Sequence, residues 1–236
     1  MPTLLLLLTL FLTSIPPGVG NPEKILRVRP TADFTVAGDG RAVAWQKAET
    51  QSLTRRGGTL PYEVRVKMLY SSTGLYLLME GSDQRVTATF MEDFQDLWKE
   101  DAFEAYFWPE EKDSLYLEYQ ISPLGKELIL LIPNLDGKFL GWRPWHYEGG
   151  RKTRKAVSGV GGTLQSGAAI AGWKAEIFLP YELFTPLRNV PPRPGTRWRA
   201  NFYRMDHDQG ARSSWHWAPV GPSFHEPHKF GVLIFE

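Results

Sequence analysis

Apolar and polar side chains alternate over many short stretches of this chain. Phe103, Ala105 and Phe107 fall on one side of an extended strand, because successive side chains of a strand point to opposite faces. A period of two is typical of a strand that buries one face. This pattern, together with further short apolar runs, predicts strands over 62–70, 75–79, 102–108, 115–122, 126–132, 155–160, 172–179, 197–205 and 229–235.

Turn-forming residues separate these strands. The segment 71–74 closes a hairpin, and the prolines and glycine of 191–195 interrupt regular structure before the strand that follows. Helix is expected only in short pieces such as 181–184. Short strands joined by such turns predict an all-β fold, an antiparallel β-sandwich. The long irregular segment 133–155 carries Trp142, Trp145, His146 and Tyr147, and loops of this length are often functional.

The N-terminus has the features of an export signal. The apolar run from Leu4 to Ile15 is too short to span a bilayer comfortably. Two prolines end the run, and small residues at 18–20 offer a cleavage site before Asn21. The first residues carry no Lys or Arg, so only the amino terminus is positive there. We therefore predict a cleaved signal peptide over 1–20 and a single mature domain over 21–236, secreted or periplasmic, without a membrane span.

Composition narrows the classes of function. The 236 residues are 42% hydrophobic, which is enough for one substantial core. The formal net charge of +1 gives no indication of nucleic acid or of an anionic membrane as partner. Cysteine is absent, which excludes disulfides, thiolate metal sites and a cysteine nucleophile.

The polar faces of the predicted strands carry chemistry suited to a sugar. Glu104 and Gln120 converge if strands 102–108 and 115–122 are neighbours. Trp98 precedes the first of these strands in a polar loop, and Asn201 and Tyr203 share the polar face of 197–205. A carboxylate accepts hydroxyl hydrogen bonds, an amide donates and accepts, and flat rings cover sugar C–H faces. The structural alternative is that Trp98 caps the sandwich edge and that Glu104 is a solvated strand residue.

Several segments resemble family 9 carbohydrate-binding modules and their relatives. They are FTVAGDGRAVAW, WKEDAFEAYF, YLEYQISPLG, GWKAEIFLPYELF, WRANFYRMD and FHEPHKFGVLIF, in this order between Phe34 and Phe235. The resemblance covers nearly all of the predicted mature chain. It implies a β-sandwich that binds carbohydrate.

The resemblance also implies roles for individual residues. An aromatic residue at the position of Trp98 stacks on the sugar, and a second one clamps it from a C-terminal loop, where this chain has Phe224 instead of tryptophan. Polar side chains at Glu104, Gln120 and Tyr203 complete the family's site. At Gln120 and Tyr203 the residue type departs from the family's pattern, so a different sugar or a weaker site is expected.

Two other classes of function stay open from the sequence. A glycoside hydrolase needs two carboxylates that flank the scissile bond. Among the candidate carboxylates, only Glu104 and Glu118 could approach each other across neighbouring strands. A haem-binding sandwich would need axial ligands such as Met91 with His207 or His225.

Metal binding is a further alternative. The histidines have no zincin spacing; they are His146, His207, His216, His225 and His228. Acidic loops at 38–40, 91–93 and 206–208 offer oxygens to calcium, and the resemblance implies structural calcium without placing its ligands. Arg204 is expected to pair with Asp206 or Asp208, or to reach the ligand.

Together these observations predict non-catalytic binding of a plant-type oligo- or polysaccharide that supports carbohydrate catabolism. Glycoside hydrolases are the candidate partners, through association rather than through chemistry in this chain.

Overall fold

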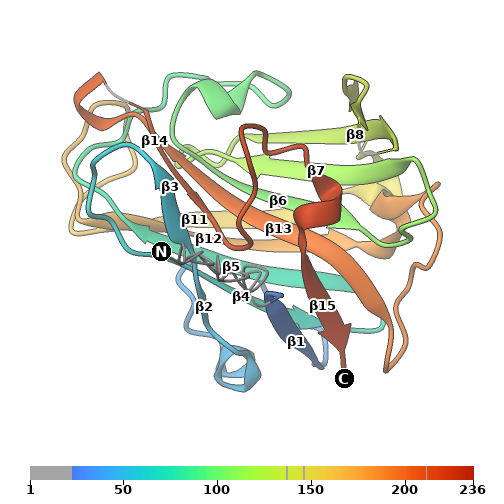
Figure 1. Cartoon of the computed structure of the whole chain (residues 1–236). Helices are drawn as coiled ribbons and strands as arrows, with labels where there is room; N and C mark the ends of the chain where they lie inside the picture. The colour runs from blue at the N-terminus through green and yellow to red at the C-terminus, as the bar shows by residue number, and fades with distance from the viewer. Residues whose placement is uncertain (1–22, 137, 146, 211) are drawn as a thin grey trace, which may run out of the picture.

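The computed structural model describes residues 23–236 except 137, 146 and 211. The predicted signal peptide 1–20 and His146 therefore lie outside the described residues. Two layers of strands pack face to face (Figure 1). Among the described residues, no helix has the length and apolar character needed to cross a membrane.

The first layer contains the strands that later form the site. Its order is β10-β8-β7-β6-β13-β15, with β14 and β3 extending from β13 and with β9 on β8. Their bounds are β3 Thr54–Gly57, β6 Ala102–Trp108, β7 Leu115–Ile121, β8 Glu127–Leu135, β9 Lys138–Phe139, β10 Arg143–Pro144, β13 Arg197–Asp206, β14 Ser213–His216 and β15 Gly231–Phe235.

The second layer has the order β4-β5-β12-β11, with β2 on β4. Its bounds are β2 Gln51–Ser52, β4 Val64–Tyr70, β5 Gly74–Ser82, β11 Arg154–Val160 and β12 Gly172–Pro180. The helical pieces are 3-10 turns, namely η1 Val43–Lys47, η2 Leu97–Lys99, η3 Gly149–Arg151, η4 Tyr181–Phe184, η5 Asp208–Gly210 and η6 Pro227–Lys229. The predicted β-sandwich with short helical pieces is confirmed.

One strand departs from the antiparallel prediction. β1 (Ile25–Pro30) runs parallel to β15 through its first residues and parallel to β4 through Arg29 and Pro30. Because it pairs with one layer and then with the other, β1 joins the two layers into a single hydrogen-bonded sheet.

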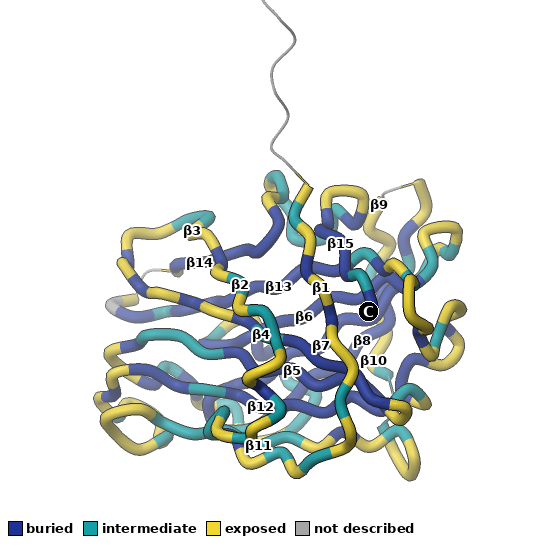
Figure 2. The backbone as a smooth tube through the Cα atoms, turned by 90° about the horizontal axis from the view of Figure 1, so that it is seen from below, coloured by how far each residue is buried: buried dark blue, intermediate teal, exposed yellow. Residues whose placement is uncertain are grey.

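The core fills the space between the layers. Phe103 of β6 meets Trp173 of β12 with ring centroids 4.0 Å apart, and both side chains are fully buried. The odd-numbered face of β6 and β7 thus packs against the second layer, as its alternation predicts. Figure 2 shows that the buried residues follow the strands of both layers, while the exposed residues are concentrated in the connections.

The opposite face of the first layer is also buried. Tyr106 and Trp108 of β6, Tyr116 of β7 and Tyr203 of β13 are at most 2% exposed. They form a second apolar cluster with Leu97 and Phe230 from the surrounding loops. The even-numbered face, which the sequence suggests is polar and solvated, is therefore covered by loops, and the candidate site lies beneath them.

Candidate functional site

A cavity of about 400 Å³ lies on the outer face of β6, β7 and β8. Its floor consists of strand residues, and three loop segments around 94–98, 139–144 and 222–225 form its walls. Arg212 lines it from the exposed segment before β14. Of the six binding residues that the sequence predicts, four line this cavity: Trp98, Glu104, Gln120 and Phe224.

Strand register places the polar floor. Glu104 lies directly opposite Gln120, and Tyr106 lies directly opposite Glu118. All four side chains occupy one face, because each strand's members are two residues apart. The predicted convergence of Glu104 and Gln120 is confirmed, and the structure adds Glu118 and Tyr106 to the same floor.

The floor residues satisfy only part of one another's hydrogen bonding. The Tyr106 hydroxyl donates to Glu104 Oε2 at 2.9 Å, and the Gln120 amide donates to Glu118 Oε1. Glu104 Oε1, Glu118 Oε2 and Gln120 Oε1 have no hydrogen-bond partner among the described residues. All three side chains are at most 2% exposed. A buried acceptor without a partner costs about 1–3 kcal/mol, so these oxygens favour a ligand that brings donors.

Burial changes the ionisation of the two carboxyls. Desolvation raises the pKa of Glu104 well above its ordinary range, and the nearby charge of Glu118 raises it further. Desolvation likewise raises the pKa of Glu118. The structural alternative, that Glu104 is a solvated strand residue, is wrong, because the surrounding loops remove its side chain from water.

Trp98 forms one wall of the cavity. It lies in η2, where the buried neighbour Leu97 anchors the turn, and its own side chain remains 38% exposed. Lys99 Nζ lies 5.2 Å from the ring centroid. A ring that lines a cavity while remaining this exposed is not a buried cap of the sandwich edge, and it can stack on a ligand.

Phe224 lines the cavity from the C-terminal loop. Its ring stacks on Tyr203, with centroids 4.1 Å apart and an interplanar angle of 8°, and the Tyr203 hydroxyl donates to the Phe224 carbonyl at 2.9 Å. The guanidinium carbon of Arg56 is 5.0 Å from the Phe224 centroid. Tyr203 therefore covers one face of this ring and fixes its orientation.

The structure does not bring Asn201 and Tyr203 to the cavity surface. Both are fully buried, and neither lines the cavity. Asn201 Nδ2 donates to the Tyr203 hydroxyl at 2.8 Å and to the Ala218 carbonyl at 2.9 Å, and its Oδ1 accepts from the backbone N–H groups of Phe202 and Ala218. Their polar atoms are thus used within the chain. Both residues support the loop that carries Phe224.

Three wall residues, His225, Phe139 and Trp142, were not predicted as part of the site. Together with Tyr106 of the floor they form a column of nearly parallel rings, in the order Tyr106, His225, Phe139 and Trp142, with successive centroids 5.5, 4.1 and 6.1 Å apart. The column runs from the buried floor to Trp142, which is 52% exposed. Tyr116 shares a 2.6 Å hydrogen bond with His225 Nδ1, and burial lowers the pKa of His225 to about 4. The aromatic content of 133–155 was the only sequence signal for this wall.

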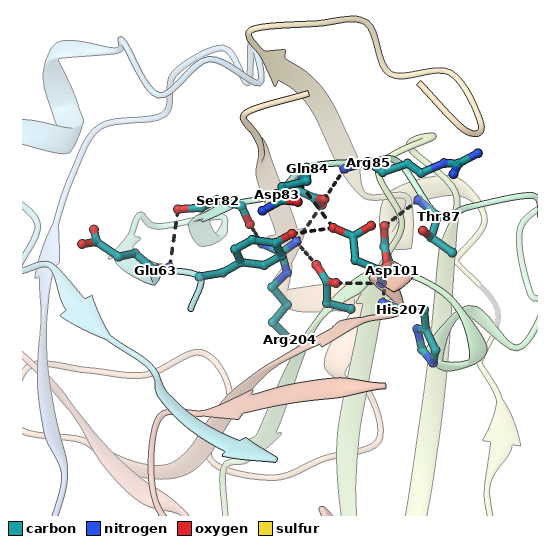
Figure 3. Close-up of polar contacts among 12 residues, drawn as sticks. Glu63, Ser82, Asp83, Gln84, Arg85, Thr87, Asp101, Arg204 and His207 are labelled. Carbon is teal, nitrogen blue, oxygen red and sulfur yellow. Dashed lines mark hydrogen bonds and ion pairs between the residues drawn. The ribbon is translucent and has the colours of Figure 1, made fainter. Parts of the chain in front are cut away.

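A second polar cluster lies apart from the cavity, around Arg204. Figure 3 shows Arg204 bound to Asp83, and beside them Asp101, which accepts hydrogen bonds from the backbone of Thr87 and His207. The guanidinium donates to Asp83 Oδ2 at 2.7 Å and to Asp206 Oδ2 at 2.5 Å, and all three side chains are fully buried. The predicted pairing of Arg204 with Asp206 is confirmed, and Arg204 is not among the cavity's lining residues.

This cluster is the place to test the implied calcium. Carboxylate oxygens of Asp83, Asp101 and Asp206 lie within 4.8 Å of one another, the only such acidic or histidine group among the described residues. However, the Arg204 guanidinium already binds the carboxylates of Asp83 and Asp206. The Asp101 carboxylate accepts hydrogen bonds from the backbone N–H groups of Thr87 and His207. A second cation would meet this positive charge at close range. The donor set therefore fits calcium poorly.

The haem alternative also lacks support in the geometry. Met91 is 65% exposed and does not line the cavity that contains His225. The structure does not present Met91 and His225 as an axial pair, and His207 does not line the cavity either.

A sandwich whose outer face holds a cavity with a carboxylate and amide floor and aromatic walls belongs to the class of small-ligand binding modules. The model of carbohydrate-binding family 9 matches residues 39–235. This match covers most of the chain, and the chain belongs to carbohydrate-binding family 9.

Individual relatives are more distant. An extracellular protein of Arthroderma benhamiae is 24% identical over 186 residues, which are 73% of this chain and 78% of the relative. A Bacteroides uniformis protein, described as a candidate carbohydrate-binding protein, has a similar structure with a TM-score of 0.72 and 20% identity, covering 91% of this chain and all of that one.

A family 9 module of Caldicellulosiruptor kristjanssonii, solved with cellotriose, gives a TM-score of 0.65 at 12% identity over 90% of this chain and 94% of the module. A structure with glucose gives a TM-score of 0.65 at 13% identity over 90% of this chain and 96% of the other. At this identity the likeness is one of fold.

Proposed function

We propose that the chain binds carbohydrate in the cavity above β6 and β7 and does not cleave it. The observation that carries this proposal is the set of three buried, unpartnered acceptor oxygens on Glu104, Glu118 and Gln120, enclosed by the rings of Trp98 and Phe224. Sugar hydroxyls supply the missing donors, and sugar C–H faces pack on the rings.

Membership in family 9 supports this assignment, and the related modules solved with cellotriose and glucose suggest a ligand built of gluco-configured units. We propose a plant-type oligo- or polysaccharide as the ligand and a supporting role in carbohydrate catabolism beside glycoside hydrolases. Binding experiments should therefore begin with cello- and xylo-oligosaccharides.

The Trp98→Ala variant is expected to bind such a sugar at least tenfold more weakly than the wild type. Ring stacking contributes about 0.5–1.5 kcal/mol beyond the area buried, and the truncation removes both contributions. A site this small implies dissociation constants of roughly micromolar to millimolar. Isothermal titration calorimetry measures the change, and the thermal unfolding midpoint should stay close to that of the wild type, because the ring is partly exposed.

Val43→Ala is the matched control, since Val43 is 75% exposed and lies outside the cavity. Its affinity should equal that of the wild type. If the folded Trp98→Ala variant binds sugar as tightly as the wild type, Trp98 does not contact the ligand.

Hydrolysis is the second candidate function. The raised pKa values of Glu104 and Glu118, which lie on one cavity floor, are what a general acid requires. Both carboxyls, however, project from neighbouring strands of the same floor, and each is tied to an adjacent side chain. The test is release of reducing ends from cellulose, xylan and mixed glucans. If the wild type releases reducing ends and Glu104→Gln does not, the protein is a glycoside hydrolase and not only a binding module.

We also propose that the protein is exported, which agrees with the extracellular relative. Mass spectrometry of the protein recovered from outside the cytoplasm should show an N-terminus near Asn21, because the small residues at 18–20 precede it. Exported protein that retains Met1 would contradict cleavage.

A further inference from the structure

The two buried carboxyls on the cavity floor, those of Glu104 and Glu118, form no salt bridge with any described residue. Among the described residues, no Lys or Arg side chain forms an ion pair with Glu104 or Glu118, whereas the buried Asp83 and Asp206 share Arg204. Arg212 lines the cavity from an exposed position, and its charge lowers the pKa of Glu104, but burial and the charge of Glu118 outweigh this effect. A buried carboxylate without a counter-charge is unfavourable, so this floor favours a ligand that is itself positive.

Hydrogen-bonding capacity on the floor is one-sided as well. When both carboxyls are ionised, the three unpartnered atoms are all acceptors, namely Glu104 Oε1, Glu118 Oε2 and Gln120 Oε1. The Tyr106 hydroxyl and the Gln120 amide nitrogen already donate to the two carboxylates. A neutral hydroxyl brings one donor and also lone pairs that need donors, whereas an ammonium group brings three donors and no acceptor.

The walls suit a cation too. Trp98, Tyr106, Phe139, Trp142 and Phe224 line the same cavity. The faces of aromatic rings attract ammonium groups, most strongly where water is excluded. Hydrogen bonds between an ammonium and a carboxylate are also stronger than those between neutral groups. Charge, donor count and wall composition therefore favour the same chemical group.

We propose that the preferred ligand of this cavity is an amine-bearing sugar, a 2-amino sugar of gluco configuration, whose ammonium group binds between Glu104, Glu118 and Gln120. This inference rests on the proposed sugar site and names its ligand class. The raised pKa values of the two carboxyls fit it, because in the free protein protonation relieves the charge that the bound ammonium neutralises in the complex.

The test compares three β-1,4-linked disaccharides by isothermal titration calorimetry at pH 6.5, built from glucose, glucosamine and N-acetylglucosamine. The amine disaccharide should bind the wild type at least tenfold more tightly than the other two, since acetylation removes both the charge and two of the three donors. Equal affinity of the glucose and glucosamine forms, or a preference for either neutral form, would overturn the inference while leaving sugar binding intact. Binding of none of the three, nor of xylo-oligosaccharides, would count against the proposed function itself.

Glu118→Gln removes one carboxylate and keeps the side chain's size. The ratio of amine to glucose affinity should fall to less than a third of its wild-type value, with folding checked by circular dichroism. An unchanged ratio in the folded variant would mean that Glu118 does not bind the ammonium group, and it would contradict the proposal. If this variant does not fold, Glu104→Gln serves with the same expected ratio, and the wild-type comparison remains decisive.

Discussion

Replacing Arg204 with methionine should lower the free energy of unfolding by about 3–5 kcal/mol, the range measured when one partner of a buried ion pair is removed. The guanidinium is fully buried and binds Asp83 and Asp206. Burial already raises the pKa of Asp101 to about 8, with the charges of Asp206 and Asp83 as further causes. Without Arg204, these aspartates would face one another with no counter-charge.

Urea denaturation followed by tryptophan fluorescence measures this loss. Arg65→Met is the matched control, because the side chains of the Arg65–Glu63 pair are 48% and 73% exposed and such pairs contribute at most about 1 kcal/mol. A loss below about 1 kcal/mol for Arg204→Met would show that Arg204 is not the cation on which the cluster depends. A metal would then become the better explanation for the three aspartates.

Replacing Glu104 with glutamine should weaken sugar binding by about 1–3 kcal/mol, the scale of a hydrogen bond to a charged group. The substitution preserves the side chain's size, and the amide carbonyl can still accept from Tyr106. The NH2 group then takes the place of the unpartnered Oε1, so a donor replaces the acceptor that faces the ligand. Calorimetry with the best ligand measures the difference. Unchanged affinity would mean that the ligand does not reach the floor.

The same variant should also change how the stability of the protein depends on pH. Because the pKa of Glu104 is raised in the folded state, the folded protein binds the proton more tightly than the unfolded chain. The stability of the wild type should therefore fall as the pH rises from 5 to 9. Glu104→Gln lacks this group, so its thermal midpoint should fall less over that range.

The repeating pattern of the long strands was sufficient to predict the layers and part of the site. A period of two defines which face of β6 and β7 is buried, and it brings Glu104 opposite Gln120 once the strands are neighbours. β1 was not predicted, although Leu26 and Val28 alternate with polar residues, because the pattern covers only six residues. Its parallel pairing depends on the crossing between layers, and local sequence does not contain that information.

The covering of the polar face could not be predicted for a different reason. Segments 139–144 and 222–225 have no periodicity, and their positions are set by contacts with residues far away in the chain. One example is the hydrogen bond between Tyr116 and His225, which are 109 residues apart. Without those loops Glu104 appears solvated, and Asn201 and Tyr203 appear available to a ligand. With the loops in place, these two side chains hydrogen-bond within the chain instead.

The most direct measurement of the central claim is a crystal structure of the protein with a bound oligosaccharide. Our account predicts one sugar unit in the cavity, stacked on Trp98 and with donors directed at Glu104, Glu118 and Gln120. A sugar bound on another surface, with the cavity free of ligand, would contradict it.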